Sequence, residues 1–216
     1  MMKLYHRMDC PFCWKVRIFL AEAGIAVDEI IVEFGKKHPD VMALNPNGTV
    51  PVLVTEDFVL WESAVIIEYL ADKYKDAGLL SGTAEQRAKI RQLHSYSDAL
   101  VGKILFPHIK RVREGEGDKK EIRPDPETEE GWQNIQKLLS NALANDPFFG
   151  PEFSVADCAL IPRITLAHIY GLPLGDDFQS LKNWFRSCVK RPSFKRCLPE
   201  HFLGIDEMIK PEKFLI

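Results

Sequence analysis

The pattern that most constrains the fold is a change near residue 80. Before it, short β-branched runs alternate with helical runs, whereas no strand pattern follows residue 82. The predicted order before the change is strand, helix, strand, a two-stranded hairpin and a helix. A strand–helix–strand unit has parallel strands, and a hairpin adds antiparallel ones. We therefore predict an α/β domain with a mixed four-stranded sheet over residues 1–76 and an all-helical domain over residues 83–216.

The individual elements follow from periodicity and from end signals. We predict strands over residues 3–6, 26–32, 49–54 and 58–61. Helices are predicted over residues 11–24, 64–75, 84–113, 126–145 and 178–190, and after Ser154. Gly102 and Pro107 are the expected kinks or breaks in the long helix. Ser154 and Asp157 have capping-box spacing, and the charged segment 113–130 is expected to be a solvated loop.

Composition and charge exclude several classes of function. The chain has 216 residues, of which 46% are hydrophobic and 27% charged, as in ordinary globular proteins. Its net charge of −3 gives no basic footprint for nucleic acid. No apolar run approaches the roughly 18 residues of a membrane span, and the first residues lack a signal-peptide pattern. We expect a cytoplasmic protein that binds neither nucleic acid nor membranes.

The sequence "CPFC" places Cys10 and Cys13 where the first strand gives way to a helix. A structural zinc site needs four ligands, and the other three cysteines are scattered singly. We therefore expect no metal. A disulfide between Cys10 and Cys13 would close too short a loop to stabilise the fold much, and the cytosol is reducing. The motif therefore indicates redox or catalytic use.

Cys10 is expected at or next to the helix N-cap, because Pro11 suits the first helical position. The helix dipole and unpaired N–H groups stabilise a thiolate there. Lys15 and Arg17 are expected to add positive charge nearby. Cys13 lies one turn deeper, and two interpretations stay open: it resolves a mixed disulfide on Cys10, or it is a small buried core residue.

Two further segments indicate ligand binding. Pro51 begins a strand after Val50; a trans bond is expected from frequency alone, because only about 5–6% of such bonds are cis. A cis bond would leave the Val50 backbone available to an extended peptide ligand. Ser63 is a natural N-cap for the next helix, where a carboxylate can bind, and the neighbouring Glu62 can accept from an ammonium. Plain capping is the alternative interpretation for Ser63.

Together, Cys10-Pro11-Phe12-Cys13, Val50-Pro51 and Glu62-Ser63, followed by a helical half, resemble the glutathione S-transferase superfamily over nearly the whole chain. The resemblance implies a thioredoxin-like N-terminal domain, a cis Val50–Pro51 bond and a homodimer. It also implies that glutathione is the co-substrate. The implied glutathione-binding residues are Phe12, Lys37 or His38, Val50, Pro51, Glu62 and Ser63, and the implied catalytic residues are Cys10 and Cys13.

The cysteine motif resembles the omega, dehydroascorbate reductase and glutaredoxin-like branch, in which a protein thiolate forms a mixed disulfide with glutathione. Tyr5 is therefore not expected to activate glutathione. The implied co-substrate is a small disulfide or electrophile, bound between the domains near Tyr96, Phe106, His108 and the segment 204–216. The chain also resembles the stringent starvation protein A group, which binds RNA polymerase and generally lacks the cysteine. Another alternative is a chloride-channel-like relative, although no long apolar segment supports membrane insertion.

Overall fold

The computed structural model describes residues 1–33, 35–114 and 123–199. Its four strands form one mixed sheet in the order β2-β1-β3-β4. The β1–β2 pair is parallel, and the β1–β3 and β3–β4 pairs are antiparallel, which confirms the predicted sheet. The strands are β1 (Lys3–His6), β2 (Asp28–Ile31), β3 (Val52–Val54) and β4 (Val59–Trp61).

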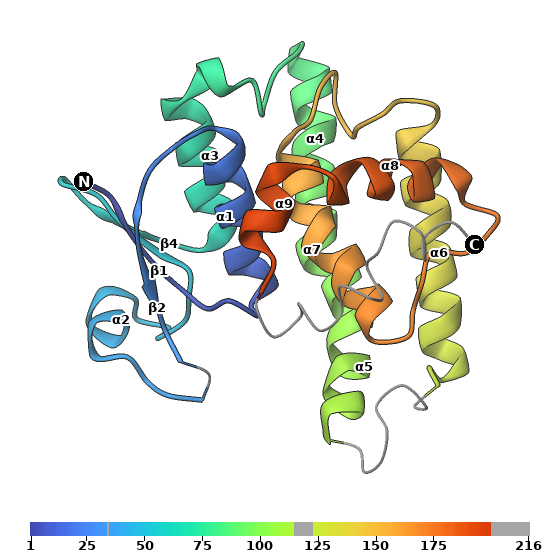
Figure 1. The fold of residues 1–216 in the computed structure, drawn as a ribbon, viewed down its shortest axis with the longest axis horizontal. Helices are drawn as coiled ribbons and strands as arrows, with labels where there is room; N and C mark the ends of the chain where they lie inside the picture. Colours follow the sequence, from blue (N-terminus) through green and yellow to red (C-terminus); the bar gives the residue numbers. More distant parts are fainter. Residues whose placement is uncertain (34, 115–122, 200–216) are drawn as a thin grey trace.

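Alternating side chains cover the two faces of the sheet with different helices. Leu4 and Leu53 share one buried cluster with residues of α1 (Pro11–Glu22) and α3 (Ser63–Lys73). Tyr5 and Val52, one residue away along the same strands, belong to a second cluster that contains a residue of α2 (Pro39–Leu44). A period of two residues therefore builds two packed faces. Figure 1 shows α1 and α3 on the side of the sheet that faces the helical half.

The second half of the described chain is helical, as predicted. Its central element is α7, in which every residue from Val155 to Ala167 is buried. The neighbouring helices surround α7 in Figure 1. The elements are η1 (Lys75–Ala77), α4 (Ala84–Tyr96), the π-helical η2 (Ser97–Val101), α5 (Gly102–Glu114), α6 (Pro126–Leu143), α7 (Val155–Ile169), α8 (Gln179–Val189) and α9 (Pro192–Cys197).

Helix α1 joins the two halves, because it packs against α7 and α9 as well as against α3. At its C-terminal end, the Glu22 carboxylate accepts hydrogen bonds from Arg191 Nε at 2.7 Å and Nη2 at 2.6 Å. Arg191 also lies over the ring of Phe153, 4.1 Å from its centroid. The helix that follows Cys10 is therefore anchored by contacts with both halves of the protein.

The predicted capping box at the start of α7 is confirmed. Asp157 Oδ2 accepts hydrogen bonds from the Ser154 N–H at 2.8 Å and from its Oγ at 2.9 Å. The other oxygen accepts from the Phe149 N–H at 3.1 Å and from Trp184 Nε1 at 2.7 Å. Asp157 is fully buried, so one carboxylate satisfies donors from three segments.

The predictions for the helix ends were confirmed in part. The segment 84–113 is interrupted by the π-helical turn η2 directly before Gly102, one of the two expected break points, whereas α5 continues through the other, Pro107. Ser63 is the first residue of α3 and not its cap, because Glu62 occupies the cap position. The short helix α9 was not predicted, although it begins at Pro192, a residue favoured at the first helical position.

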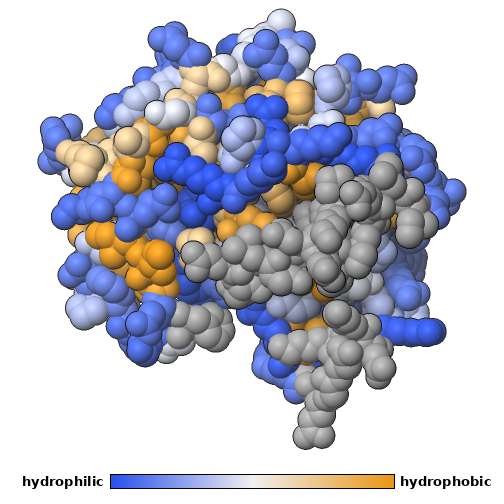
Figure 2. All heavy atoms as spheres, in the orientation of Figure 1, coloured by the Kyte–Doolittle hydropathy of each residue, from blue (hydrophilic) through white to orange (hydrophobic). Residues whose placement is uncertain are grey.

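Residues 115–122 of the predicted loop 113–130, and the whole of the segment 204–216, lie outside the described residues. In Figure 2, polar and charged residues cover most of the visible described surface, with apolar patches between them. Among the helices that the structure describes, none has the length and apolar character that a bilayer crossing requires.

Candidate active site

Cys10 is the N-cap of α1, as predicted, and Pro11 is the first helical residue. The Cys10 backbone is extended, with φ −86° and ψ 116°. The Cys10 carbonyl accepts from the Trp14 N–H at 2.8 Å, which starts the helical ladder. This geometry leaves the sulfur at the positive end of the helix dipole, where a thiolate is favoured.

The environment of Cys10 favours its ionised form. A hydrogen bond from the Cys13 thiol, with further ones from the backbone N–H groups of Cys13 and Phe12 and the charge of Arg7, lowers the pKa of Cys10 to about 7. Burial acts in the opposite direction, because it disfavours the charged form. About half of the Cys10 side chains are therefore thiolate at neutral pH.

The pKa of Cys13 is shifted in the opposite direction from that of Cys10. Burial, and then its hydrogen bond to Cys10, raise the pKa of Cys13 well above the usual range. Its side chain is fully buried, and its sulfur accepts a hydrogen bond from the Arg7 N–H at 3.4 Å. At neutral pH, Cys13 is a thiol that supports the Cys10 thiolate.

Cys10 opens into a pocket of about 400 Å³, a size typical of small-ligand sites. The peptide bond between Val50 and Pro51 at its wall is cis, as the family resemblance implied. The pocket is lined by Arg7, Cys10, Phe12, Val32, Glu33, Gly35, Lys36, His38, Val41, Gly48, Thr49, Val50, Pro51, Glu62 and Ser63.

Glu62 has an unusual backbone at the edge of this pocket. Its φ is 69° and its ψ is 110°, a region that residues with a Cβ rarely adopt. Such a conformation costs about 1–3 kcal/mol and is concentrated at functional sites. It places Glu62 ahead of the buried Ser63, at the N-terminus of α3, where backbone N–H groups can hold a carboxylate.

Seven of the predicted site residues line one pocket. They are Cys10, Phe12, His38, Val50, Pro51, Glu62 and Ser63. Cys13 is buried beneath them, and Lys37 is exposed and not among the lining residues. Arg7 and Lys36 do line the pocket but were not predicted. For Arg7 the signal was its position directly after β1, at the end of the strand that faces the thiols.

Other predicted side chains lie elsewhere. The Tyr5 hydroxyl donates to Asp40 Oδ2 at 3.0 Å, so Tyr5 is engaged away from the thiols. Tyr96 lines a separate hollow of about 710 Å³ between α4 and α6, which contains none of the residues around Cys10. His108 is buried, with Nε2 2.8 Å from the Tyr170 carbonyl. Phe106 packs against Phe12, with ring centroids 6.0 Å apart.

Lys15 and Arg17 were expected to add positive charge near Cys10, and of the two Lys15 interacts electrostatically with that thiolate. Both side chains are also engaged in ion pairs. Arg17 Nε donates to Glu29 Oε2 at 2.8 Å. Lys15 Nζ lies 2.5 Å from Asp98 Oδ2 and 2.7 Å from His94 Nε2.

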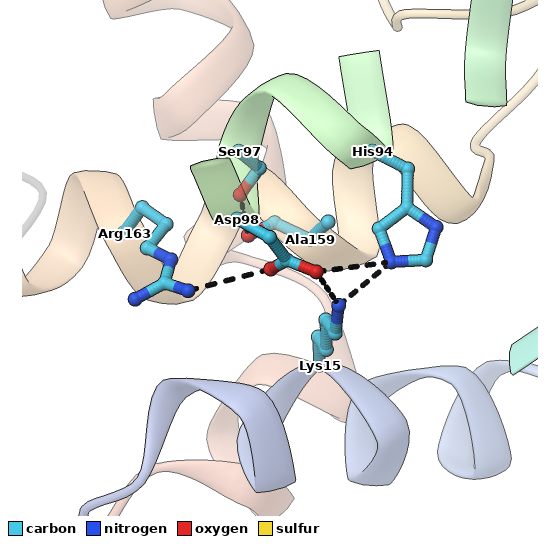
Figure 3. Close-up of polar contacts among 6 residues, drawn as sticks. All are labelled: Lys15, His94, Ser97, Asp98, Ala159 and Arg163. Atoms are coloured by element: carbon cyan, nitrogen blue, oxygen red, sulfur yellow. Dashed lines mark hydrogen bonds and ion pairs between the residues drawn. The ribbon is translucent and has the colours of Figure 1, made fainter. Parts of the chain in front are cut away.

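Asp98 is the centre of a polar cluster between the two halves of the protein (Figure 3). It comes from the π-helical turn η2, and its Oδ1 accepts from Arg163 Nη2 at 3.3 Å. In the same turn, the Ser97 hydroxyl donates to the Ala159 carbonyl at 2.9 Å. Burial, and then the charge of Lys15, lower the pKa of His94 to about 4, so the imidazole is neutral at pH 7. This cluster connects α1, η2 and α7 directly behind the thiols.

Across residues 1–33, 35–114 and 123–199, no three His, Cys, Asp or Glu side chains are grouped as metal ligands would be. The five cysteines are all free and buried.

The fold is similar to that of glutathione S-transferases. Family models described as "Glutathione S-transferase, N-terminal domain" and "Glutathione S-transferase, C-terminal domain" match residues 9–73 and 98–192. A crystal structure of a glutathione S-transferase from Rhodospirillum rubrum F11 is similar with a TM-score of 0.77 and 29% identity, and the match covers 93% of each chain. The protein therefore belongs to the glutathione S-transferase superfamily.

Curated relatives divide between two kinds of protein. A stringent starvation protein A homolog from Histophilus somni is 29% identical over 88% of this chain and 86% of its own. Glutathione S-transferase GstB from Escherichia coli (strain K12) is also 29% identical, over 91% of this chain and 97% of its own. Sequence similarity therefore establishes the superfamily, but it does not distinguish a transferase from a stringent starvation protein A homolog.

Proposed function

We propose that this protein is a glutathione-dependent thiol transferase that uses Cys10 as its nucleophile. The observation that carries the proposal is the Cys10 thiol, which has a pKa of about 7 and lies at a helix N-terminus in a ligand-sized pocket. An activated thiolate attacks disulfides, whereas a transferase that only conjugates glutathione needs a hydroxyl donor to the glutathione sulfur.

We expect three parts of glutathione to meet different residues of the pocket. The Val50 backbone, beside the cis proline, would pair with the cysteinyl backbone of glutathione as a strand edge pairs with a peptide. Glu62 would accept from the γ-glutamyl ammonium, and the α3 N-terminus at Ser63 would hold its carboxylate. Of the two residues predicted for the glycine carboxylate, His38 is the better supported because it lines the pocket.

The reaction requires one protein thiol. The Cys10 thiolate attacks the glutathionyl sulfur of a mixed disulfide, and the other half leaves as a thiolate that takes a proton. The thiolate of a second glutathione then attacks the sulfur of glutathione bound to Cys10. This step forms oxidised glutathione and restores the Cys10 thiolate. Cys13 stays protonated throughout and acts as a hydrogen-bond donor, consistent with its burial and raised pKa.

The test compares the protein with Cys10→Ser and Cys13→Ser in three assays. We expect glutathione-dependent reduction of a glutathione mixed disulfide and of dehydroascorbate, with weak conjugation of an aryl halide. Cys10→Ser should abolish reduction, and Cys13→Ser should retain it. Loss of reduction in both variants would favour a dithiol mechanism instead. Absence of all three activities in the unaltered protein would contradict the proposal.

A second candidate rests on the relatives named stringent starvation protein A homologs, one of which is 30% identical over 92% of this chain. In this alternative the protein binds RNA polymerase and is not an enzyme. Co-sedimentation with purified RNA polymerase, in the absence of any reductase activity, would favour it. The Cys10 environment favours the enzyme, because an interaction protein has no need of an activated thiol.

The proposal keeps the homodimer and the cytoplasmic location that were expected from the sequence. Analytical ultracentrifugation would give the mass of the assembly. Cell fractionation would give the location.

A further inference from the structure

Arg163 is a buried arginine next to the active-site helix. It lies in the middle of α7, with 1% of its surface exposed. Its guanidinium carbon is 4.5 Å from the centroid of the Phe12 ring and 4.8 Å from that of Phe106. Phe12 lines the glutathione pocket two residues after Cys10. Arg163 is therefore separated from the pocket by a single aromatic ring.

The hydrogen bonding of Arg163 is incomplete. One terminal nitrogen, Nη2, donates to Asp98, and Figure 3 shows the other end of the guanidinium directed away from this carboxylate. That second nitrogen, Nη1, is buried and has no hydrogen-bond partner within the described ranges. A buried charged donor without an acceptor is costly, so its presence points to a ligand that supplies one.

The charge of the surrounding cluster also favours an anion. Lys15 and Arg163 are both cationic, Asp98 is the single carboxylate that they share, and His94 is neutral at pH 7. Among these described groups one positive charge is left over, and the Cys10 thiolate, which interacts electrostatically with both cations, offsets it only while Cys10 is ionised. An excess buried charge destabilises a fold unless an opposite charge comes close to it.

Phe106 is the side chain that could uncover this nitrogen. It is 39% exposed, although its ring contacts the buried guanidinium. Gly102 makes this contact possible, because a Cβ there would lie 3.1 Å from the Phe106 ring and 3.7 Å from the Arg163 guanidinium carbon. Rotation of an exposed ring is a rapid, local motion.

We propose that Arg163 Nη1 binds a carboxylate or similar oxyanion on the half of the acceptor that is not glutathione, with Phe106 moving aside. The acceptors are therefore small anionic mixed disulfides. This inference rests on the thiol transferase function proposed above, and it gives that function a substrate class.

The first experiment measures charge preference at Cys10 without requiring catalysis. Iodoacetate and iodoacetamide have nearly the same size, and both alkylate only the thiolate. The ratio of their rates therefore cancels any change in the ionisation of Cys10. The rates are followed by mass spectrometry of the full chain, with Cys10→Ser as the background. We expect Arg163→Met to lower the iodoacetate-to-iodoacetamide ratio about tenfold, the effect of losing one charge-assisted hydrogen bond.

Three further variants complete this experiment. Arg163→Lys should recover part of the ratio, and Arg91→Met, which removes an exposed ion pair with Glu68, should leave it unchanged. Phe106→Ala should raise the ratio, and it provides the test if Arg163→Met does not fold. A ratio within twofold of the unaltered protein in Arg163→Met, or no rise in Phe106→Ala, would overturn the inference.

The second experiment separates the inference from the proposed function. It compares reduction of the glutathione mixed disulfides of 3-mercaptopropionate, which is anionic, and of 2-mercaptoethanol, which is neutral. We expect kcat/KM to be about tenfold higher for the anionic disulfide, and Arg163→Met to remove this preference. Equal rates for both disulfides would refute the inference but leave the function intact. Reduction of neither would refute the function, while the alkylation ratio would still decide whether Arg163 attracts an anion.

Discussion

Replacing Cys13 with alanine would remove the largest single influence that lowers the pKa of Cys10 to about 7. An unperturbed cysteine has a pKa of about 8.5. A return to that value would reduce the thiolate fraction at pH 7 from about one half to about 3%. This change is roughly fifteenfold and corresponds to about 2 kcal/mol of lost thiolate stabilisation. In the variant, the backbone N–H groups and Arg7 would still lower the pKa of Cys10, and burial would still raise it.

The assay is the rate of Cys10 alkylation by iodoacetamide between pH 5 and pH 10. We expect the midpoint of the profile to move from about 7 toward 8.5 in Cys13→Ala, with nearly equal rates at pH 10, where Cys10 is ionised in both proteins. Cys13→Ser is the matched control, because its hydroxyl can still donate to the Cys10 thiolate. A midpoint that stays at about 7 in Cys13→Ala would refute the role of the Cys13 hydrogen bond.

Three other predictions concern stability and binding. His94 has a pKa of about 4 in the folded protein and about 6.5 in the unfolded chain, so the unfolded chain binds the proton first as the pH falls from 6.5 to 4. Urea titrations should therefore show a free energy of unfolding about 2 kcal/mol lower at pH 5 than at pH 7, and a smaller decrease in His94→Gln. Asp157→Ala should lower the free energy of unfolding by about 3–5 kcal/mol in the same assay, because Trp184 Nε1 and two backbone donors lose their acceptor. A decrease below about 1 kcal/mol would contradict the capping role of Asp157. Glu62→Gly should raise stability by about 1 kcal/mol through relief of the backbone and weaken glutathione binding in calorimetry, while Glu62→Ala should weaken binding without the gain.

Much of the fold was predictable because local patterns encode it. The alternation around Leu4 and Leu53 specifies which strand residues face α1 and α3, and the helical period specifies α6 and α8. End signals were reliable where the chemistry is local, as at Pro11 and at the Ser154 capping box. They failed at α3, because the positive φ of Glu62 puts the cap one residue earlier.

The candidate site was predictable in part, for a similar reason. Cys10 and Cys13 are one helical turn apart, so their pairing at the start of α1 follows from the sequence. The contribution of Arg7 does not, because it depends on where β1 ends relative to the helix. Lys37 and His38 are adjacent in sequence, and only the folded loop distinguishes the one that lines the pocket.

The sequence by itself determined the division into an α/β half and a helical half, the thiol at a helix N-terminus and the segments that surround it. Only the tertiary structure decided what lies behind that thiol. Lys15 and Asp98 are 83 residues apart, and Asp98 and Arg163 are 65 apart. Hydrophobic periodicity predicts which face of a helix or strand is buried, but it does not predict which charged side chain from a distant part of the sequence will pack against that face. Arg163 Nη1, which has no hydrogen-bond partner among the residues that the structure describes, is buried where α7, η2 and α1 pack together.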